Sequence, residues 1–207
     1  MTYTRDDRVL YSLRFSPPQL FSENTGNPFV FGLFDMIQEL QEGGIQEAKM
    51  LEIGSYMGES TALFGMSNLF KQIHCIEPFS GGEPFSDQHD YDWKYVENQF
   101  LLNTRHYTNI LHHREFSQDI HSSFADEYFD FIYIDANHSY ESVKSDLINY
   151  LPKVKTGGYI GGHDYRFPQL AATEEPPFPG CVKAIDEVIQ KPTRVFKDSS
   201  WIKRVDR

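Results

Sequence analysis

Basic residues are scarce in this sequence relative to acidic ones. Its 207 residues include 19 Lys and Arg against 30 Asp and Glu, for a formal net charge of −11 with His taken as neutral. Nucleic acids and anionic membrane surfaces are bound through clustered positive charge. We therefore expect neither a nucleic acid nor a membrane as a partner.

Cysteine and long apolar runs are also scarce. Cys75 and Cys181 are the two cysteines, and they form no C-x-x-C pair, so we expect reduced, structural thiols of the kind usual in the cytosol. No run approaches the 18 apolar residues of a membrane span. The N-terminal residues MTYTRDDRVL are polar and charged, unlike a secretory signal. These absences predict a cytoplasmic protein.

What the sequence does contain predicts one globular domain over residues 1–207. Hydrophobic residues make up 40% and aromatic residues 15%, which is typical of a folded chain of this length. Turn-forming residues such as Ser16-Pro17-Pro18 predict an irregular N-terminal arm over 1–28. Apolar residues at helical spacing predict a helix over 29–42, which Gly43-Gly44 ends.

Strands and helices alternate from residue 49 onward. Short apolar or β-branched runs predict strands at 49–54, 73–78, 110–114, 129–135 and 157–162. Helices are predicted at 60–71, 92–107, 119–125, 139–151 and 182–190. Two closing strands, 194–196 and 201–205, are expected to form an antiparallel pair. Since strand–helix–strand units build parallel sheets, we expect an α/β fold whose ligands bind at the carboxyl ends of the strands.

The first candidate binding site is the turn Glu52-x-Gly54-x-x-x-Gly58, followed by Glu77 at the end of the next strand. Glycines let a ligand approach the backbone, and an acidic residue at that strand end accepts ribose hydroxyls. Two phosphate fingerprints are missing: position 56 is Tyr where a dinucleotide loop has Gly, and there is no G-K-[ST]. Glu52 would also repel phosphates. A nucleoside with a cationic amino-acid end, S-adenosylmethionine, fits better. The alternative is an ordinary turn with a solvated Glu.

Several short motifs also resemble a known family. LEIGSYMGES at 51–60 and HCIEPF at 74–79 resemble motif I and the ribose-binding segment of the class I S-adenosylmethionine-dependent methyltransferases. FSQDI at 116–120 and IDANHSYESVKSDL at 134–147 resemble the metal-dependent O-methyltransferases, of the catechol O-methyltransferase and macrocin/cephalosporin-hydroxylase-like branches. GGYIGGHDY and CVKAIDEVI are similar to the second branch. The resemblance covers about residues 49–205.

The resemblance implies a Rossmann-like, doubly wound, mostly parallel seven-stranded sheet with helices on both faces. Its motifs place the methionine end of the cofactor at the first turn, the ribose at Glu77, and the adenine beside the segment after the third strand. The cofactor-binding residues it implies are Glu52, Gly54, Ser55, Tyr56, Gly58, Glu77, Ser117, Gln118, Asp135 and Ala136.

A metal site is the second candidate. Asp135 ends one strand, and His163-Asp164 follow the next strand-like segment. If those strands are neighbours, the three side chains converge at one edge, and the resemblance gives all three as ligands. Carboxylates suit Mg²⁺ or Mn²⁺, while His163 shifts the preference toward Mn²⁺, Fe²⁺, Co²⁺ or Zn²⁺. The alternative is that His163 and Asp164 bind substrate directly, or brace each other, without a metal.

His138 is the candidate general base, and Asp135, three residues earlier, is the second candidate catalytic residue. It stands where the catechol branch has a catalytic lysine, and an imidazole titrates near neutrality. Its alternative is a residue that merely starts a helix. The expected reaction is methyl transfer from S-adenosylmethionine to a hydroxyl of a small molecule, of sugar or polyphenol type, with a divalent metal positioning the acceptor oxygens. The loops 79–93 and 165–181 are candidate substrate lids, and the aromatic N-terminal arm favours a homodimer.

Two other functions remain open. A non-haem metal enzyme, either a hydroxylase or a hydrolase, could use the same scaffold with Asp135, His163 and Asp164 as ligands and His138 nearby. A non-catalytic cofactor-binding protein could retain the fold, since fold does not fix function.

Overall fold

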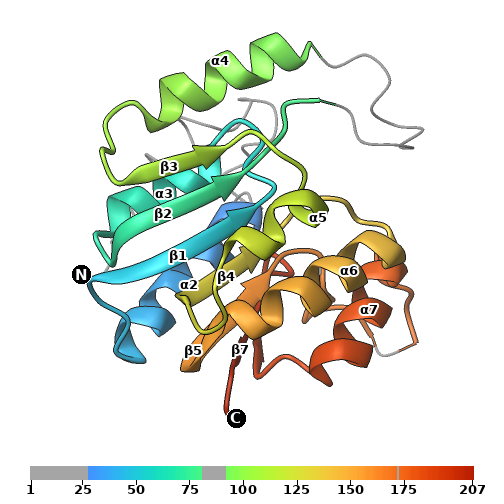
Figure 1. Ribbon diagram of the computed structural model, residues 1–207. Helices are drawn as coiled ribbons and strands as arrows, with labels where there is room; N and C mark the ends of the chain where they lie inside the picture. The colour runs from blue at the N-terminus through green and yellow to red at the C-terminus, as the bar shows by residue number, and fades with distance from the viewer. Residues whose placement is uncertain (1–27, 81–91, 172) are drawn as a thin grey trace.

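A seven-stranded sheet forms the centre of the computed structural model, which describes residues 28–80, 92–171 and 173–207 (Figure 1). The strand order is β3-β2-β1-β4-β5-β7-β6. The strands are β1 Ala48–Ile53, β2 Phe70–Ile76, β3 Ile110–His113, β4 Phe129–Ile134, β5 Val154–Gly162, β6 Arg194–Val195 and β7 Trp201–Arg204. Strands β1 to β5 are parallel, and β7 runs antiparallel to both β5 and β6. The predicted fold class, including the antiparallel closing pair, is confirmed.

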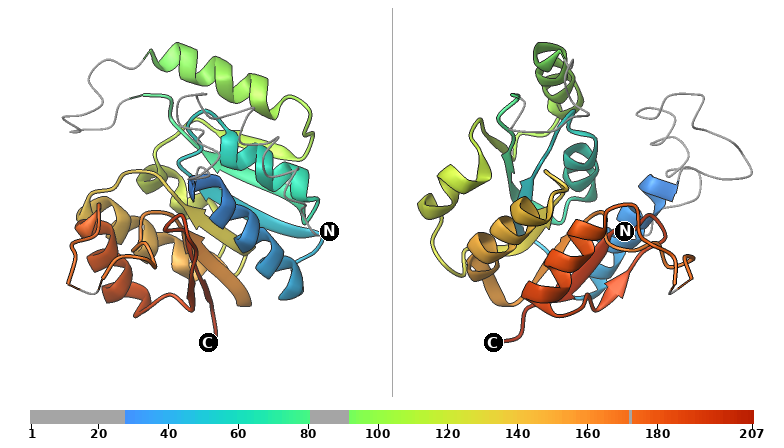
Figure 2. Two further views of the ribbon diagram at one scale, coloured as in Figure 1. Left: turned by 180° about the vertical axis from the view of Figure 1, so that it is seen from behind. Right: turned by 90° about the vertical axis from the view of Figure 1, so that its right-hand side faces the viewer.

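Helices cover both faces of the sheet (Figures 1 and 2). They are α2 Pro28–Glu42, α3 Glu59–Ser67, α4 Trp93–Thr104, α5 Ser117–Ile120, α6 Tyr140–Tyr150 and α7 Pro179–Ile189, with short 3-10 turns at His121–Ser123 and Leu151–Lys153. Helices α2, α3 and α4 contribute to the core on one face, and α5, α6 and α7 to the core on the other. In the described part of the chain, no helix is long and apolar enough to cross a membrane.

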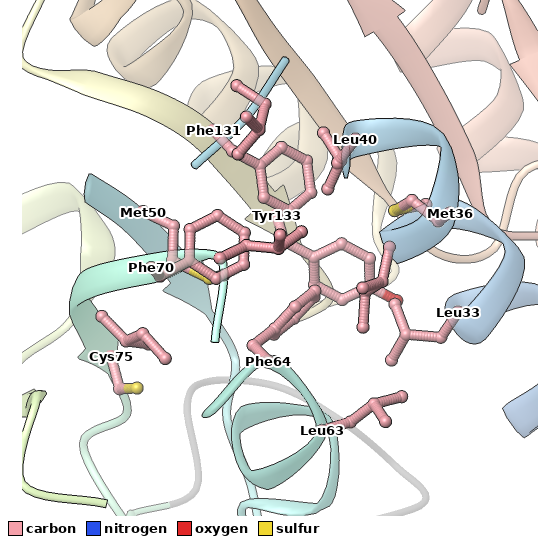
Figure 3. Close-up of a cluster of buried hydrophobic side chains, with 14 of the residues drawn as sticks. Leu33, Met36, Leu40, Met50, Leu63, Phe64, Phe70, Cys75, Phe131 and Tyr133 are labelled. Atoms are coloured by element: carbon pink, nitrogen blue, oxygen red, sulfur yellow. The ribbon is translucent and has the colours of Figure 1, made fainter. Parts of the chain in front are cut away.

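Two hydrophobic cores hold these layers together, because successive strand residues point to opposite faces. In β1, Met50 enters the core under α2 and α3, while Leu51 enters the core under α6 and α7. The first core is rich in aromatic rings: Phe64 meets Phe131 and Tyr133 edge-on, with ring centroids 5.9 and 5.3 Å apart (Figure 3). Both cysteines are buried free thiols.

Some predicted boundaries were wrong. The helix expected over 60–71 ends at Ser67, because Asn68 adopts a left-handed backbone (φ 57°) that terminates α3, and the chain enters β2 at Phe70. The strand expected at 157–162 begins earlier, at Val154. The predicted arm 1–28 lies outside the described residues except for Pro28, which begins α2.

The two predicted lids are described only in part. Residues 81–91 of the first and residue 172 of the second lie outside the described residues. At the start of the first lid, Phe79 is buried and packs on Phe100, with ring centroids 5.5 Å apart. The loop in which the second lid is predicted ends earlier than expected, because α7 begins at Pro179 and takes the buried Cys181 into the helix.

Candidate active site

The loops that follow β1 and β4 lie against each other. These two strands are neighbours in the sheet, and the strand order reverses between them. Gly54 has a positive φ of 87°, and a Cβ there would lie 2.2 Å from the carbonyl oxygen of Asp135. The backbone N–H of Asp135 donates to Ile53 over 2.8 Å. Glycine is thus required at position 54, and the crevice at such a switch point is where open α/β sheets bind ligands.

Glu77 directly follows β2, and its side chain is hydrogen-bonded to the turn between β1 and α3. Its carboxylate accepts hydrogen bonds from the backbone N–H groups of Tyr56 (3.0 Å) and Phe79 (3.1 Å). Burial raises the pKa of Glu77 even though these N–H groups favour its charged form. The carboxylate therefore stands beside the turn, at the position that the resemblance gives to ribose recognition.

Glu52 lies beneath the turn. It is fully buried, and the hydroxyls of Ser60 and Thr61 donate to its two carboxylate oxygens. Burial raises its pKa to about 7, against the opposing effect of these hydrogen bonds. Gly58 stands at the N-cap of α3 with a φ of 77°. In this arrangement Glu52 braces the start of α3, and Ser55 beside it is also buried.

The predicted adenine residues start α5. The hydroxyl of Ser117 donates to the buried carboxylate of Asp146 in α6 over 2.6 Å, and the hydroxyl of Tyr150 donates to the Ser117 carbonyl over 2.7 Å. Burial raises the pKa of Asp146 to about 6. Gln118 is exposed. The Ser117 hydroxyl is thus bonded to α6, and what these contacts fix is the position of the α5 backbone.

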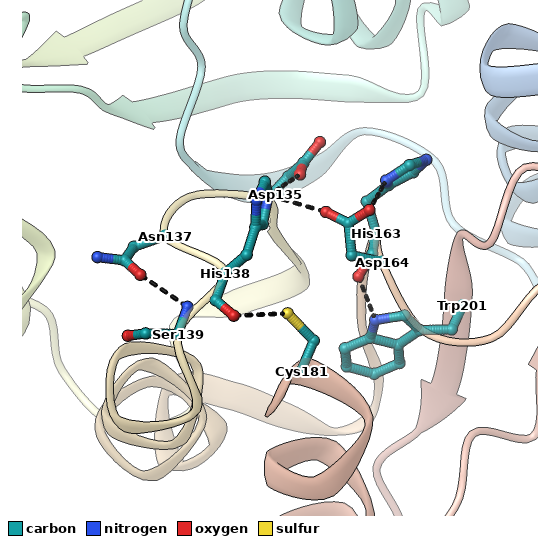
Figure 4. Close-up of polar contacts among 8 residues, drawn as sticks. All are labelled: Asp135, Asn137, His138, Ser139, His163, Asp164, Cys181 and Trp201. Atoms are coloured by element: carbon teal, nitrogen blue, oxygen red, sulfur yellow. Dashed lines mark hydrogen bonds and ion pairs between the residues drawn. The ribbon is translucent and has the colours of Figure 1, made fainter. Parts of the chain in front are cut away.

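Asp135, His138 and Asp164 form a compact cluster at the ends of β4 and β5. One donor atom from each lies within 4.8 Å of the others. The Nε2 atom of His138 is 2.8 Å from Oδ2 of Asp164 and 3.8 Å from Oδ1 of Asp135 (Figure 4). Burial alone would lower the pKa of His138, but its hydrogen bonds to the two carboxylates outweigh burial and raise that pKa to about 10.

Asp164 lies between two imidazoles. Its Oδ1 atom is 2.9 Å from Nδ1 of His163, on the other side from His138 (Figure 4). The two histidines hold the pKa of Asp164 well below its usual range, although burial opposes them. The same carboxylate helps raise the pKa of His163 to about 9 against the effect of burial. Asp164 has a φ of 60°, a strained backbone conformation for a non-glycine residue and one that is concentrated at functional sites.

The structure brings together two of the three side chains that the sequence predicts as metal ligands. Strands β4 and β5 are neighbours, and Asp135 and Asp164 converge as expected. His163 contacts Asp164 but is not one of the three clustered side chains, and His138 takes that place. The contact between His163 and Asp164 also matches the alternative in which these two residues brace each other.

Two residues that the sequence analysis did not name, Phe178 and Asp198, act on the two histidines. The ring of Phe178 lies 4.5 Å from that of His138, between centroids. Phe178 lies in the predicted lid 165–181, within the stiff run Pro176-Pro177-Phe178-Pro179, although the sequence does not mark it there as a neighbour of His138. Asp198 is fully buried, and its negative charge helps to raise the pKa of His163. No local pattern marks Asp198, because it reaches the site from the turn before β7.

The family of the chain follows from a comparison with known proteins. Residues 51–165, more than half of the sequence, match the family model described as a methyltransferase domain. This chain belongs to the class I S-adenosylmethionine-dependent methyltransferases. The matched region runs from β1 through the cluster, so it contains both the Gly54 turn and Asp164. No curated protein matches the sequence.

Solved structures share the fold of this methyltransferase at low sequence identity. A protein from Corynebacterium glutamicum is 14% identical with a TM-score of 0.60, covering 100% of this chain and 93% of that one. A candidate caffeoyl-CoA O-methyltransferase from Staphylococcus aureus is 15% identical with a TM-score of 0.57, covering 94% and 88%. A SAM-dependent methyltransferase from Aquifex aeolicus is 15% identical with a TM-score of 0.52, covering 95% and 96%.

Proposed function

We propose that this methyltransferase transfers the methyl group of S-adenosylmethionine to a hydroxyl of a small molecule, of sugar or polyphenol type, with a divalent metal that positions the acceptor oxygens. The observation that carries the proposal is the cluster of Asp135, His138 and Asp164 directly beside the Gly54 turn. Donor and acceptor sites therefore share one edge of the sheet. The similarity to a candidate caffeoyl-CoA O-methyltransferase supports an oxygen acceptor.

The residues around the β1–α3 turn fit the cofactor. The Gly54 turn leaves no side chain between β1 and the Asp135-Ala136 backbone. Glu77 presents a carboxylate at the end of β2, where it can accept the ribose hydroxyls. The backbone of Asp135 lies against this turn while its side chain belongs to the cluster, so one residue would border both the cofactor and the acceptor.

The cluster also fits a divalent metal. Asp135 and Asp164 offer carboxylate oxygens beside an imidazole, the donor types that Mn²⁺ and similar ions bind. A bound metal lowers the pKa of a coordinated hydroxyl, as it does that of bound water. The sulfonium is already a good leaving group, so the chain's main task is to align the acceptor oxygen with the methyl group. Asp135 and His138 are the polar groups that would face the acceptor hydroxyl.

The acceptor would lie against Phe178. This ring is 37% exposed and stands beside His138, from the segment that connects β5 to α7. An exposed aromatic ring next to the cluster suits the flat face of a sugar or of a phenol ring. A hydroxyl carried by such a ring would then face Asp135 and Asp164.

The test is a methylation assay with S-adenosylmethionine, a panel of phenolic and sugar diols, and Mn²⁺ or EDTA. We expect O-methylated product by mass spectrometry, with Mn²⁺ increasing the rate. Asp135→Asn should abolish the product, while Asp206→Asn, at an exposed aspartate far along the sequence from the site, should leave it unchanged. The absence of O-methylated product from every diol, or equal activity of Asp135→Asn, would contradict the proposal.

A further inference from the structure

We propose that His138 is a metal ligand together with Asp135 and Asp164, and that His163 is a positioning residue that holds Asp164 rather than a ligand. This inference rests on the proposed metal dependence and deepens it. It gives His138 the ligand role that the sequence predicts for His163, and it makes the ion a transition metal.

The distances within the cluster match one ion. Metal–ligand bonds to carboxylate oxygen and imidazole nitrogen are about 2.1 Å, so adjacent ligand atoms lie about 3.0–3.5 Å apart around an octahedral or tetrahedral ion. Nε2 of His138 is 2.8 Å from Asp164 and 3.8 Å from Asp135. All three donor atoms lie within 4.8 Å of one another. Small side-chain movements therefore suffice to place them on one ion.

His163 lies on the wrong side of Asp164 to join them. It contacts Oδ1, whereas His138 contacts Oδ2, so the carboxylate separates the two rings (Figure 4). The backbone carbonyl of His163 accepts from the indole N–H of Trp201 over 3.2 Å, and its ring is in electrostatic contact with the buried Asp198. A side chain that hydrogen-bonds a metal-binding carboxylate from outside fixes the direction of that ligand. This is the arrangement of His163 around Asp164.

The backbone around His138 is fixed, as a ligand requires. The thiol of Cys181 donates to the His138 carbonyl over 3.3 Å, and the Ser139 N–H donates to the Asn137 side chain over 2.8 Å. Ser139 then caps α6, since its hydroxyl accepts from the N–H of Ser142. With Phe178 against its ring, His138 is held on both its backbone and its side chain. The site is therefore preorganised on the turn between β4 and α6.

The choice of ion follows from the ligands. Mg²⁺ prefers an all-oxygen shell, whereas an imidazole among carboxylates favours Mn²⁺, Fe²⁺, Co²⁺ or Zn²⁺. As a ligand, His138 is no longer a free proton acceptor. The reaction then depends on metal activation of the hydroxyl and on Asp135.

Pulsed EPR of the full-length protein with Mn²⁺ tests the proposal. We expect a ¹⁴N coupling from a coordinated imidazole in the wild type, lost in His138→Gln and kept in His163→Gln at saturating Mn²⁺. His163→Gln should weaken Mn²⁺ binding by about 10- to 100-fold, the usual effect of removing a residue that orients a ligand. His138→Gln should also reduce the preference for Mn²⁺ over Mg²⁺ in competition titrations. His106→Gln, at an exposed position, is the matched control.

Three results would overturn the proposal: a coupling lost in His163→Gln but kept in His138→Gln, a Mn²⁺ complex without nitrogen coupling, or no Mn²⁺ binding. Titration of each sample with S-adenosylhomocysteine in EDTA separates this failure from failure of the proposed function. A protein that binds the nucleoside but not Mn²⁺ keeps its place as a methyltransferase and loses the metal assignment.

Discussion

Gly54 sets the spacing between the cofactor turn and the acceptor cluster. Its Cβ would collide with the backbone of Asp135 and Ala136, at 2.2 and 2.5 Å, in addition to the strain of a φ of 87°. We expect Gly54→Ala to lower the free energy of unfolding by about 2–5 kcal/mol, from strain and overpacking together. Binding of S-adenosylhomocysteine should be lost with it. Urea denaturation and calorimetric titration measure the two effects.

Gly44 offers a matched control for this substitution. It has a similar φ of 89°, but a Cβ there meets nothing within 4 Å. Gly44→Ala should therefore lower the free energy of unfolding only by the cost of a left-handed backbone at alanine, about 1–2 kcal/mol. It should bind the nucleoside as the wild type does. Equal losses in the two variants would show that the contact with Asp135 does not matter.

The choice between His138 and His163 illustrates what sequence cannot decide at the scale of single residues. The strand ends place Asp135 and Asp164 together, and that much follows from the alternation of strands and helices. Which imidazole points between the carboxylates depends on the left-handed backbone of Asp164 and on the turn before α6. Asp198 arrives from a distant turn, so its approach to His163 could not be predicted either.

Among the elements, the segment between β5 and α7 carries a prediction about the acceptor. Phe178 packs against His138. It belongs to a different segment of the chain from Glu77 and the Gly54 turn, to which the cofactor is assigned. Phe178→Ala should raise the KM for the acceptor by about 2- to 13-fold, as expected for a lost aromatic contact. The dissociation constant of S-adenosylhomocysteine should not change. Phe178→Leu, which keeps apolar bulk, should have a KM for the acceptor between those of the wild type and Phe178→Ala. An unchanged KM in both variants would show that Phe178 is not part of the acceptor site.

Strands β2 and β3 carry a pair of stacked histidines, the buried His74 and the half-buried His113, that makes stability depend on pH. His74 and His113 stack, with Nδ1 of one 2.9 Å from Nε2 of the other. Burial, His113 and Lys49 lower the pKa of His74 to about 4. Between pH 6.5 and pH 4 the unfolded chain therefore binds a proton at His74 that the folded protein does not. Stability from this group is present above pH 6.5 and is lost as the pH falls toward 4.

Comparison with His74→Phe isolates this effect. Urea denaturation at several pH values should show the wild type losing stability relative to the variant below pH 6.5, by at most about 1.4 kcal/mol per pH unit for one proton. His106→Gln, at an exposed site, should follow the wild type. Parallel pH profiles for the wild type and His74→Phe would show that His74 takes up its proton equally in both states.

The elements themselves were well predicted wherever a periodic apolar run ended in glycine or a cap. The helix predicted over 139–151 is α6, with Ser139 as its N-cap, and the strand predicted over 129–135 is β4. The boundary after α3 was misread because Leu69 and Phe70 continue its apolar pattern, although Asn68 had already ended the helix. Apolar spacing cannot separate the last turn of a helix from the first residues of a buried strand.

For the whole molecule, the sheet places its chemistry at one edge. Two cores fix β1 and β4 side by side, with α3 leaving to one face and α6 to the other. The Gly54 turn and the Asp135 cluster therefore both lie at the carboxyl ends of these strands, where open α/β sheets bind ligands. A ligand bound there should stabilise the folded chain by about 2.7 kcal/mol at 100 times its dissociation constant.

Calorimetric titration of the purified protein with S-adenosylhomocysteine tests this account most directly. The account predicts saturable binding of one nucleoside per chain, retained in EDTA and in His138→Gln, and lost in Gly54→Ala. An absence of saturable binding to the wild type at millimolar nucleoside would contradict the assignment of the crevice to the cofactor.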